Sequence, residues 1–263
     1  SEPETTAVQI EEEFPLEEDL EELIRNEIEA YQFNENDLKT LFGNLRTNAE
    51  EAGQGIVTVY SVKHQTDWFN NPVETAGQYS GAVIATTPLE YLILTPIEAV
   101  SGADSIMVTT EGDEMVSGQL IGSDSVAGLA VISIQMTDLS QEALADMTVL
   151  ELGNSHTVRQ GDLLTAIGSP AGYPRSIGYG MVSYIRRDVQ VTDGISRIFY
   201  VDAPGNAEKG TFLVDMDGRI VGWTTSDYQP EGSSRVTAVR AISDYKSILE
   251  KLSNGIQVPY FGI

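Results

Sequence analysis

Two successive sets of short extended runs most constrain how this 263-residue chain can fold. The first set begins after Gly55, and the second follows a link near residues 136–150. Short strands in regular succession, separated by turn residues, are typical of antiparallel barrels rather than of alternating strand–helix units. The runs are 56–62, 82–85, 91–95, 105–110, 115–121 and 129–134, then 163–167, 178–186, 197–202, 212–214, 220–224 and 236–239. We therefore predict a mainly β protein with two six-stranded antiparallel β-barrels.

Helices are expected at the two ends of this β region. Apolar residues at helical spacing predict a helical segment over residues 16–53, in which Asn34 or Asn36 caps the second of two helices. A last helix is expected over residues 242–252, ending before Gly255. The N-terminal helices are interpreted either as a docking or self-association element or as a hairpin that covers the main body.

Negative charge is concentrated in the N-terminal fifth of the chain. Residues 1–52 hold 16 acidic and 3 basic side chains, and the net charge of the whole chain is −25. Residues 1–15 combine repelling glutamates with few apolar side chains, so we predict an acidic disordered tail. The overall charge argues against nucleic acid and against anionic lipid as partners, because both bind basic surfaces.

Residue types needed for metal or redox chemistry are scarce. The chain has no cysteine and two histidines, His64 and His156. The missing cysteines exclude disulfides, thiolate catalysis and cysteine-ligated metals. We expect both histidines to be structural or exposed, and we predict neither a cofactor nor a metal site. No run of residues is long and apolar enough to span a bilayer.

Four blocks of sequence follow one another in a recognisable order. They are GAVI at 81–84 with YLILTPIEAV at 91–100, GSD at 122–124 with GLAVI at 128–132, AIGSPAG at 166–172 with GMVS at 180–183, and VDA at 201–203 leading through KG at 209–210 to LVDMDGRIVG at 213–222. In order and spacing these blocks resemble the HtrA family of trypsin-like serine proteases, which have the chymotrypsin fold.

That resemblance implies a domain organisation. It places the first barrel over residues 54–150, and the second barrel with the C-terminal helix over residues 151–258. The last residues, PYFGI at 259–263, resemble the start of a PDZ domain in the same family. The chain is then expected to stop where a peptide-binding domain begins.

The same resemblance implies that the catalytic positions are altered. The family's histidine, aspartate and serine fall on Glu98, Gly128 and Lys209. A carboxylate is a weak base at neutral pH, a glycine orients nothing, and an ammonium is a poor acyl acceptor. The oxyanion hole falls on Ala207 and Glu208, where a glycine is lost and a negative charge is added. We therefore predict that the chain has no catalytic residue.

Three local interpretations stay open at this level. Lys209 and Thr211 could form a hydroxyl–lysine dyad, although neighbours two apart on a strand need not face each other. Glu98 and Lys209 could instead form an ion pair that fills the cleft. The loop at 169–180 matches the region that gates the active site in the family, but an ordinary inter-strand loop is the simpler interpretation.

The leading functional hypothesis is an HtrA-like pseudoprotease that binds protein or peptide segments or assembles an envelope complex. The alternative is an active serine endopeptidase of protein quality control whose catalytic site is misaligned or non-standard. A third hypothesis is a structural module that self-associates through residues 16–52. By resemblance, we expect a possible homotrimer, an extracytoplasmic bacterial location, and membrane contact only through a tether outside this chain.

Overall fold

The computed structural model describes residues 17–66, 72–192, 194–230 and 235–260, so the predicted tail at 1–15 lies outside the described residues. The chain divides into two compact units between Asn44 and Leu45. The N-terminal unit contains α1 (Glu17–Ala30) and the first part of α2 (Glu35–Gly53). Asn34 caps α2, because its side chain accepts a hydrogen bond of 2.8 Å from the backbone N–H of Asn36.

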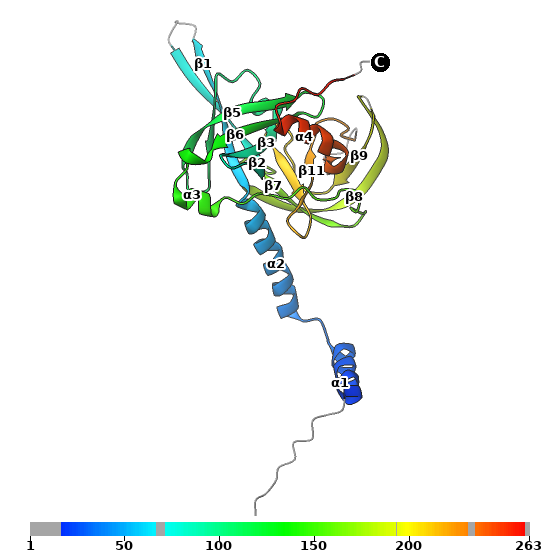
Figure 1. Cartoon of the computed structure of the whole chain (residues 1–263). Coiled ribbons are helices and arrows are strands. Elements are labelled where there is room, and N and C mark those ends of the chain that lie inside the picture. The colour runs from blue at the N-terminus through cyan, green and yellow to red at the C-terminus, as the bar shows by residue number, and fades with distance from the viewer. Residues whose placement is uncertain (1–16, 67–71, 193, 231–234, 261–263) are drawn as a thin grey trace, which may run out of the picture. The chain divides into compact units, whose positions relative to one another are not determined.

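The first barrel is a closed antiparallel sheet in the strand order β1-β2-β3-β6-β5-β4 (Figure 1). Its strands are β1 (Ile56–Thr66), β2 (Pro72–Thr86), β3 (Glu90–Pro96), β4 (Ser105–Thr109), β5 (Met115–Asp124) and β6 (Leu129–Gln135). β1 closes the barrel by pairing with β2 on one side and β4 on the other. The β1–β2 hairpin extends well beyond the predicted strands at 56–62 and 82–85.

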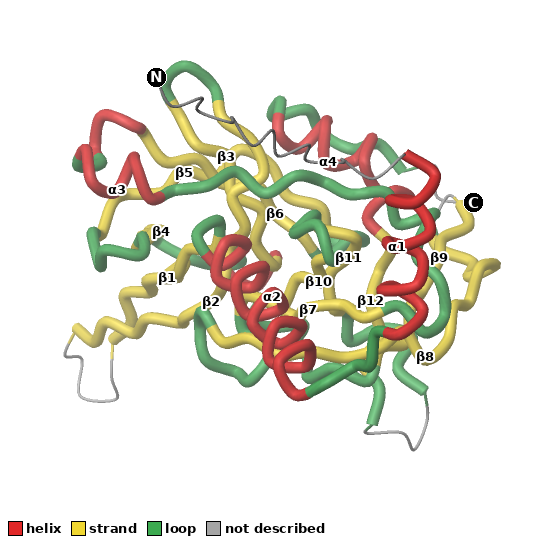
Figure 2. The backbone as a smooth tube through the Cα atoms, turned by 90° about the horizontal axis from the view of Figure 1, so that it is seen from below, coloured by secondary structure: helices red, strands yellow, loops and turns green. Residues whose placement is uncertain are grey.

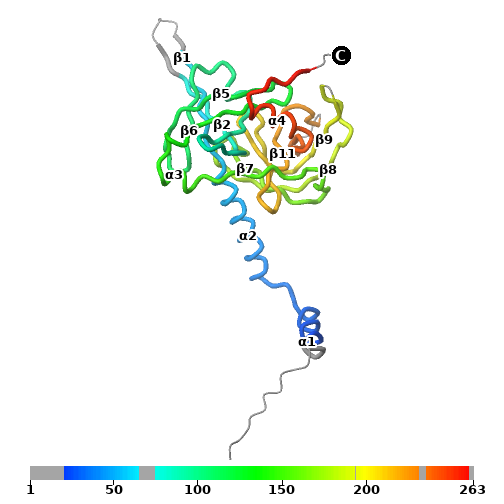
Figure 3. Tube along the Cα trace, viewed as in Figure 1, coloured from blue at the N-terminus to red at the C-terminus, as the bar shows by residue number. Residues whose placement is uncertain are grey.

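The second barrel is also closed, in the order β10-β11-β12-β9-β8-β7. Its strands are β7 (Leu163–Gly168), β8 (Ser176–Val191), β9 (Gly194–Val201), β10 (Thr211–Val214), β11 (Ile220–Thr224) and β12 (Thr237–Ala241). Figure 3 follows the chain from the first barrel into the second, so each barrel is built from one continuous stretch of sequence. The predicted fold class of two six-stranded antiparallel barrels is confirmed.

Short helices connect and cover the barrels (Figure 2). The link between the barrels contains α3 (Gln141–Asp146), which the sequence analysis did not predict and which Ser140 caps through the N–H of Ala143. The predicted C-terminal helix is present as a 3-10 turn, η3 (Ile242–Tyr245), followed by α4 (Lys246–Ser253). No helix among the described residues is long and apolar enough to cross a membrane.

One apolar cluster joins both barrels to α4. Leu94 and Leu129 of the first barrel pack there with Phe212 of the second barrel and Leu249 of α4, and each is almost fully buried. Burying a side chain of this size stabilises a fold by about 1.5–3 kcal/mol. The common core therefore keeps the barrels together, and a separate cluster fills the interior of each barrel.

The barrels meet along a seam, which we define as Ser80, Ser169, Gly168 and Gly210. The hydroxyls of Ser80 and Ser169 lie 2.8 Å apart, and both residues are fully buried. Both glycines have left-handed backbones, with φ of +103° at Gly168 and +86° at Gly210. A Cβ at Gly210 would lie 2.6 Å from the carbonyl oxygen of Ser80, so only glycine allows this close approach.

Candidate functional site

The first barrel contributes one wall of a cleft at the end of β3. Glu98 lies in a 3-10 turn, η1 (Ile97–Ala99), that directly follows this strand. The N–H of Ile97 donates to the carbonyl of Gly128 over 3.1 Å, which holds the turn against residues 125–128. The structure therefore brings together the two positions where the resemblance expects histidine and aspartate.

The segment at 125–128 is fixed by the buried carboxylate of Asp124. One of its oxygens accepts a hydrogen bond of 2.7 Å from the N–H of Ala127, and the other accepts one from the hydroxyl of Tyr260. Gly128 follows with φ of +71°, and a Cβ there would meet no atom within 4 Å. The position expected to hold the aspartate thus adjoins open space and has no side chain to fill it.

The second barrel brings Lys209 to the seam, on a turn that ends just before β10. The carbonyl of Lys209 accepts a hydrogen bond of 2.7 Å from the N–H of Ser80. Its ammonium lies 4.7 Å from the centre of the Tyr79 ring, a distance at which a cation is attracted to an aromatic face.

The structure does not show the ion pair between Glu98 and Lys209. In the described part of the chain, no carboxylate lies within 4.0 Å of the Lys209 ammonium. The face of Tyr79 takes the cation instead. Burial raises the pKa of the Tyr79 phenol, and the charges of Glu98 and Glu208 raise it further.

The backbone N–H of Lys209 is already used within its own loop. It donates to the side-chain oxygen of Asn206 over 3.0 Å. In a trypsin-like protease, the N–H of the residue at this position points at the oxyanion of the transition state. The side chain of Asn206 therefore binds the N–H that the resemblance assigns to an oxyanion hole.

The hydroxyl of Thr211 is also hydrogen-bonded within this loop. Thr211 is 1% exposed, and its oxygen accepts from the N–H of Asn206 over 3.1 Å and donates to the carbonyl of Asn206 over 3.2 Å. Lys209 Nζ lies over Tyr79, so the structure does not support a hydroxyl–lysine dyad. Asn206 instead acts as the centre of the loop's hydrogen bonds.

A cleft of about 190 Å³ lies between these elements. Its charged lining residues come from both barrels and are Glu98, Glu208, Asp227 and Arg240. Gly128 and Ala207 also line it. Four of the five residues predicted to mark the degenerate site thus line one cleft, and Lys209 lies beside it.

Arg240 was missed by the sequence analysis. It is 3% exposed and lies on β12, between the buried residues Val239 and Ala241. Burial opposes the charge of Arg240, but contacts with Tyr245 and Asp227 outweigh this and hold its pKa above the usual value. The available signal was a charged residue inside a run of apolar ones, because such a residue is rarely buried without a partner.

The comparison with known families decides the identity of this arrangement. The sequence model of the trypsin-like peptidase domain matches residues 79–222, more than half of the chain. The chain belongs to the trypsin-like peptidase family. Among solved structures, the HtrA-type protease AlgW with decapeptide is similar, with a TM-score of 0.62 and 22% identity over 79% of this chain and 67% of that chain.

Curated members of this family that match the chain are HtrA proteases. The serine protease HtrA-like of Staphylococcus epidermidis is 27% identical over 224 residues, which cover 81% of this chain and 37% of the relative. The serine protease Do-like HtrA of Bacillus subtilis is 30% identical over 199 residues, which cover 72% and 42%. The chain therefore spans about 40% of the length of these relatives.

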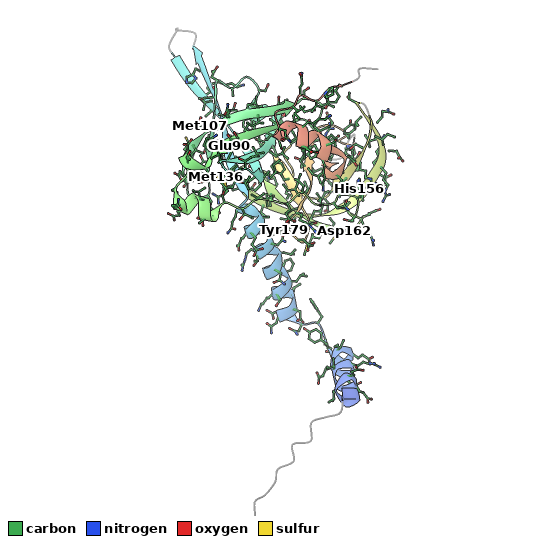
Figure 4. The ribbon with its side chains drawn as sticks, viewed as in Figure 1. Glu90, Met107, Met136, His156, Asp162 and Tyr179 are labelled. Carbon is green, nitrogen blue, oxygen red and sulfur yellow. The ribbon has the colours of Figure 1, made fainter. Side chains whose placement is uncertain are left out.

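Neither histidine lines this cleft. His64 is near the far end of β1, with its ring 3.6 Å from the carboxylate of Asp104. His156 contacts the guanidinium of Arg197, and Figure 4 shows it on the second barrel, away from Glu90 and Met107 of the first. Among the described residues, no hydroxyl is hydrogen-bonded to either imidazole.

Proposed function

We propose that this chain is a non-catalytic member of the trypsin-like peptidase family that binds peptide or protein segments in the cleft between its barrels. One observation carries most of the weight: the N–H of Lys209 donates to Asn206 and not into the cleft. Acyl transfer needs a nucleophile, a base and a free oxyanion hole together. At the expected catalytic positions, Glu98 offers a carboxylate in place of an imidazole, Gly128 has no side chain, and Glu208 adds a negative charge.

Peptide binding is supported by the kind of protein to which the chain is similar. The AlgW structure that shares its fold was determined with a decapeptide. The cleft of this chain is lined by polar groups, among them Thr225 and Ser226 next to β11. Such groups can hold an extended backbone without cleaving it, since binding and chemistry depend on different atoms.

The proposed location is outside the cytoplasm. Relatives include a probable periplasmic serine endoprotease of Pseudomonas savastanoi that is 33% identical over 162 residues, covering 60% of this chain and 31% of the relative. A role in an envelope complex, a trimeric state and a tether elsewhere in the gene product belong to the same proposal.

The test pairs a labelling experiment with a degradation assay. The chain is incubated with a fluorophosphonate probe and, separately, with casein, and trypsin serves as the positive control for both. We expect no covalent label on any serine or threonine and no casein fragments. Labelling at a single hydroxyl, lost when that residue is changed to alanine, would overturn the proposal and establish an active endopeptidase.

A further inference from the structure

The floor of the cleft contains a buried guanidinium. Each of the three nitrogens of Arg240 makes one hydrogen bond: to Asp227 over 2.7 Å, to the hydroxyl of Tyr245 over 2.6 Å, and to the hydroxyl of Thr225 over 3.4 Å. The rings of Tyr228 and Tyr245 lie 5.5 and 5.6 Å from its central carbon. Because a guanidinium has five N–H groups, two remain after these three bonds.

The carboxylate that pairs with Arg240 is not buried with it. The side chain of Asp227 is 62% exposed, whereas that of Arg240 is 3% exposed. Asp227 lies on the loop after β11, and the next residue, Tyr228, has a left-handed backbone with φ of +62°. In the described part of the chain, Asp227 is the one carboxylate within 4.0 Å of this guanidinium.

This asymmetry has a physical consequence. A guanidinium removed from water requires a close negative partner, since an unpaired buried charge costs several kcal/mol. An aspartate on an exposed loop can supply that partner and can also leave it, because its carboxylate regains water when it swings away. Asp227 therefore occupies the position that a ligand carboxylate would take on Arg240, whose planar fork suits carboxylates.

The rest of the cleft has the opposite charge. Glu98 and Glu208 line it together with Arg240, and their charges act on Tyr79. Neither glutamate lies within 4.0 Å of the Arg240 guanidinium, which pairs with Asp227. The cleft thus has a basic floor and an acidic part near Tyr79, so a complementary ligand would carry both signs of charge.

We propose that the cleft recognises a peptide carboxylate, which displaces Asp227 and binds Arg240, in a segment where basic side chains flank the acidic one. The basic side chains face Glu98 and Glu208. This inference rests on the proposed peptide-binding function and adds its ligand class. Until such a segment arrives, Asp227 acts as an internal competitor that keeps Arg240 paired.

The experiment measures binding of three fluorescein-labelled octapeptides by anisotropy. The peptides share an alanine background with a central Lys-X-Lys, in which X is Glu, Gln or Lys. We expect the Glu peptide to bind tightest to the unmodified chain and the Gln peptide roughly tenfold more weakly, because it lacks the charge that pairs with the guanidinium.

Two variants and one control make the test specific. Asp227→Asn removes the internal competitor, so we expect the Glu peptide to bind roughly tenfold tighter, because apparent affinity rises with the fraction of open sites. Arg240→Gln should abolish the preference for Glu over Gln, with folding checked by circular dichroism. Asp217→Asn is the control: it removes an exposed carboxylate from an arginine pair with Arg219 outside the cleft lining, and binding should not change.

The remaining outcomes separate the two proposals. Equal binding of all three peptides would overturn carboxylate recognition and leave peptide binding standing. Tightest binding of the Lys peptide would do the same and point to Glu98 and Glu208 as the main determinants. If no peptide binds either the unmodified chain or Asp227→Asn, the carboxylate proposal is overturned and peptide binding in this cleft loses its support. Weaker binding to Asp227→Asn would show that Asp227 is not a competitor.

Discussion

The seam and the cleft lie next to each other between the same two barrels, yet they tolerate change very differently. At the seam, a Cβ on Gly210 would lie 2.6 Å from a backbone oxygen. In the cleft, a Cβ on Gly128 would meet no atom within 4 Å. The contrast teaches that close packing fixes the backbone at the seam, whereas no packed neighbour restricts residue 128 on the cleft wall.

Replacing each glycine by alanine is the strongest test of this contrast. We expect Gly210→Ala to lower the free energy of unfolding by about 3 kcal/mol, because it combines a backbone clash with an unfavourable left-handed conformation. Gly128→Ala introduces the unfavourable left-handed conformation without a clash, so it should lower the free energy of unfolding by about 1 kcal/mol. Urea denaturation followed by tryptophan fluorescence measures both. Equal losses would show that the seam is no more constrained than the cleft.

Thr211 offers a second test, since it belongs to the packed side of the comparison. Thr211→Val keeps the shape of the side chain but removes the hydroxyl that is hydrogen-bonded to the backbone N–H and carbonyl of Asn206. A loss of about 2 kcal/mol in the free energy of unfolding is expected, because polar groups at a buried site lose their partner. Thr211→Ser retains the hydroxyl and serves as the matched control. If the valine variant is as stable as the serine variant, the loop does not depend on this hydroxyl.

The pKa of Tyr79 provides a test on the cleft side of this comparison. Its pKa is raised by burial and by Glu98 and Glu208, so the folded protein holds the phenol proton more strongly than the unfolded chain, where the pKa is about 10. Any stabilisation from this proton is present below pH 10 and is lost as pH rises through the raised pKa. Absorbance at high pH, with Tyr79→Phe subtracted, should show the phenol titrating at lower pH in Glu98→Gln/Glu208→Gln.

The smallest expected effect concerns activity. Glu98→His, Gly128→Asp and Lys209→Ser together restore the three side chains of the family's triad. We expect no measurable peptide hydrolysis, because the side-chain oxygen of Asn206 still accepts the hydrogen bond from the N–H of residue 209, which leaves that N–H unable to stabilise an oxyanion. Cleavage of a fluorogenic casein by this triple variant would show that the side chains alone were missing.

The sequence predicts the fold better than it predicts the site. The barrels follow from short apolar runs and turn residues, such as the turn at 216–218 between β10 and β11, where Gly218 has a left-handed backbone with φ of +76°. β8 was predicted to end at Arg186 but continues to Val191, where Val189 and Val191 alternate with the polar residues Asp188 and Gln190. α3 was missed because a six-residue helix shows too little periodicity to detect.

The spacing of the matched blocks was enough to select residues that lie together, since Glu98, Gly128, Ala207 and Glu208 line one cleft. The contacts of these residues could not be predicted. The hydrogen bond from Lys209 to Asn206 depends on the path of a loop, and the pairing of Arg240 with Asp227 joins residues on different segments. An ion pair between Lys209 and Glu98 was one of the interpretations left open, because opposite charges across a cleft attract, but the structure places the Lys209 ammonium over the ring of Tyr79.

Asp124 links the cleft to the C-terminal segment. One oxygen of its carboxylate accepts a hydrogen bond from the N–H of Ala127, and the other accepts one from the hydroxyl of Tyr260. Because Ala127 lines the cleft, the carboxylate of Asp124 connects the position of the Tyr260 hydroxyl to the position of the cleft wall.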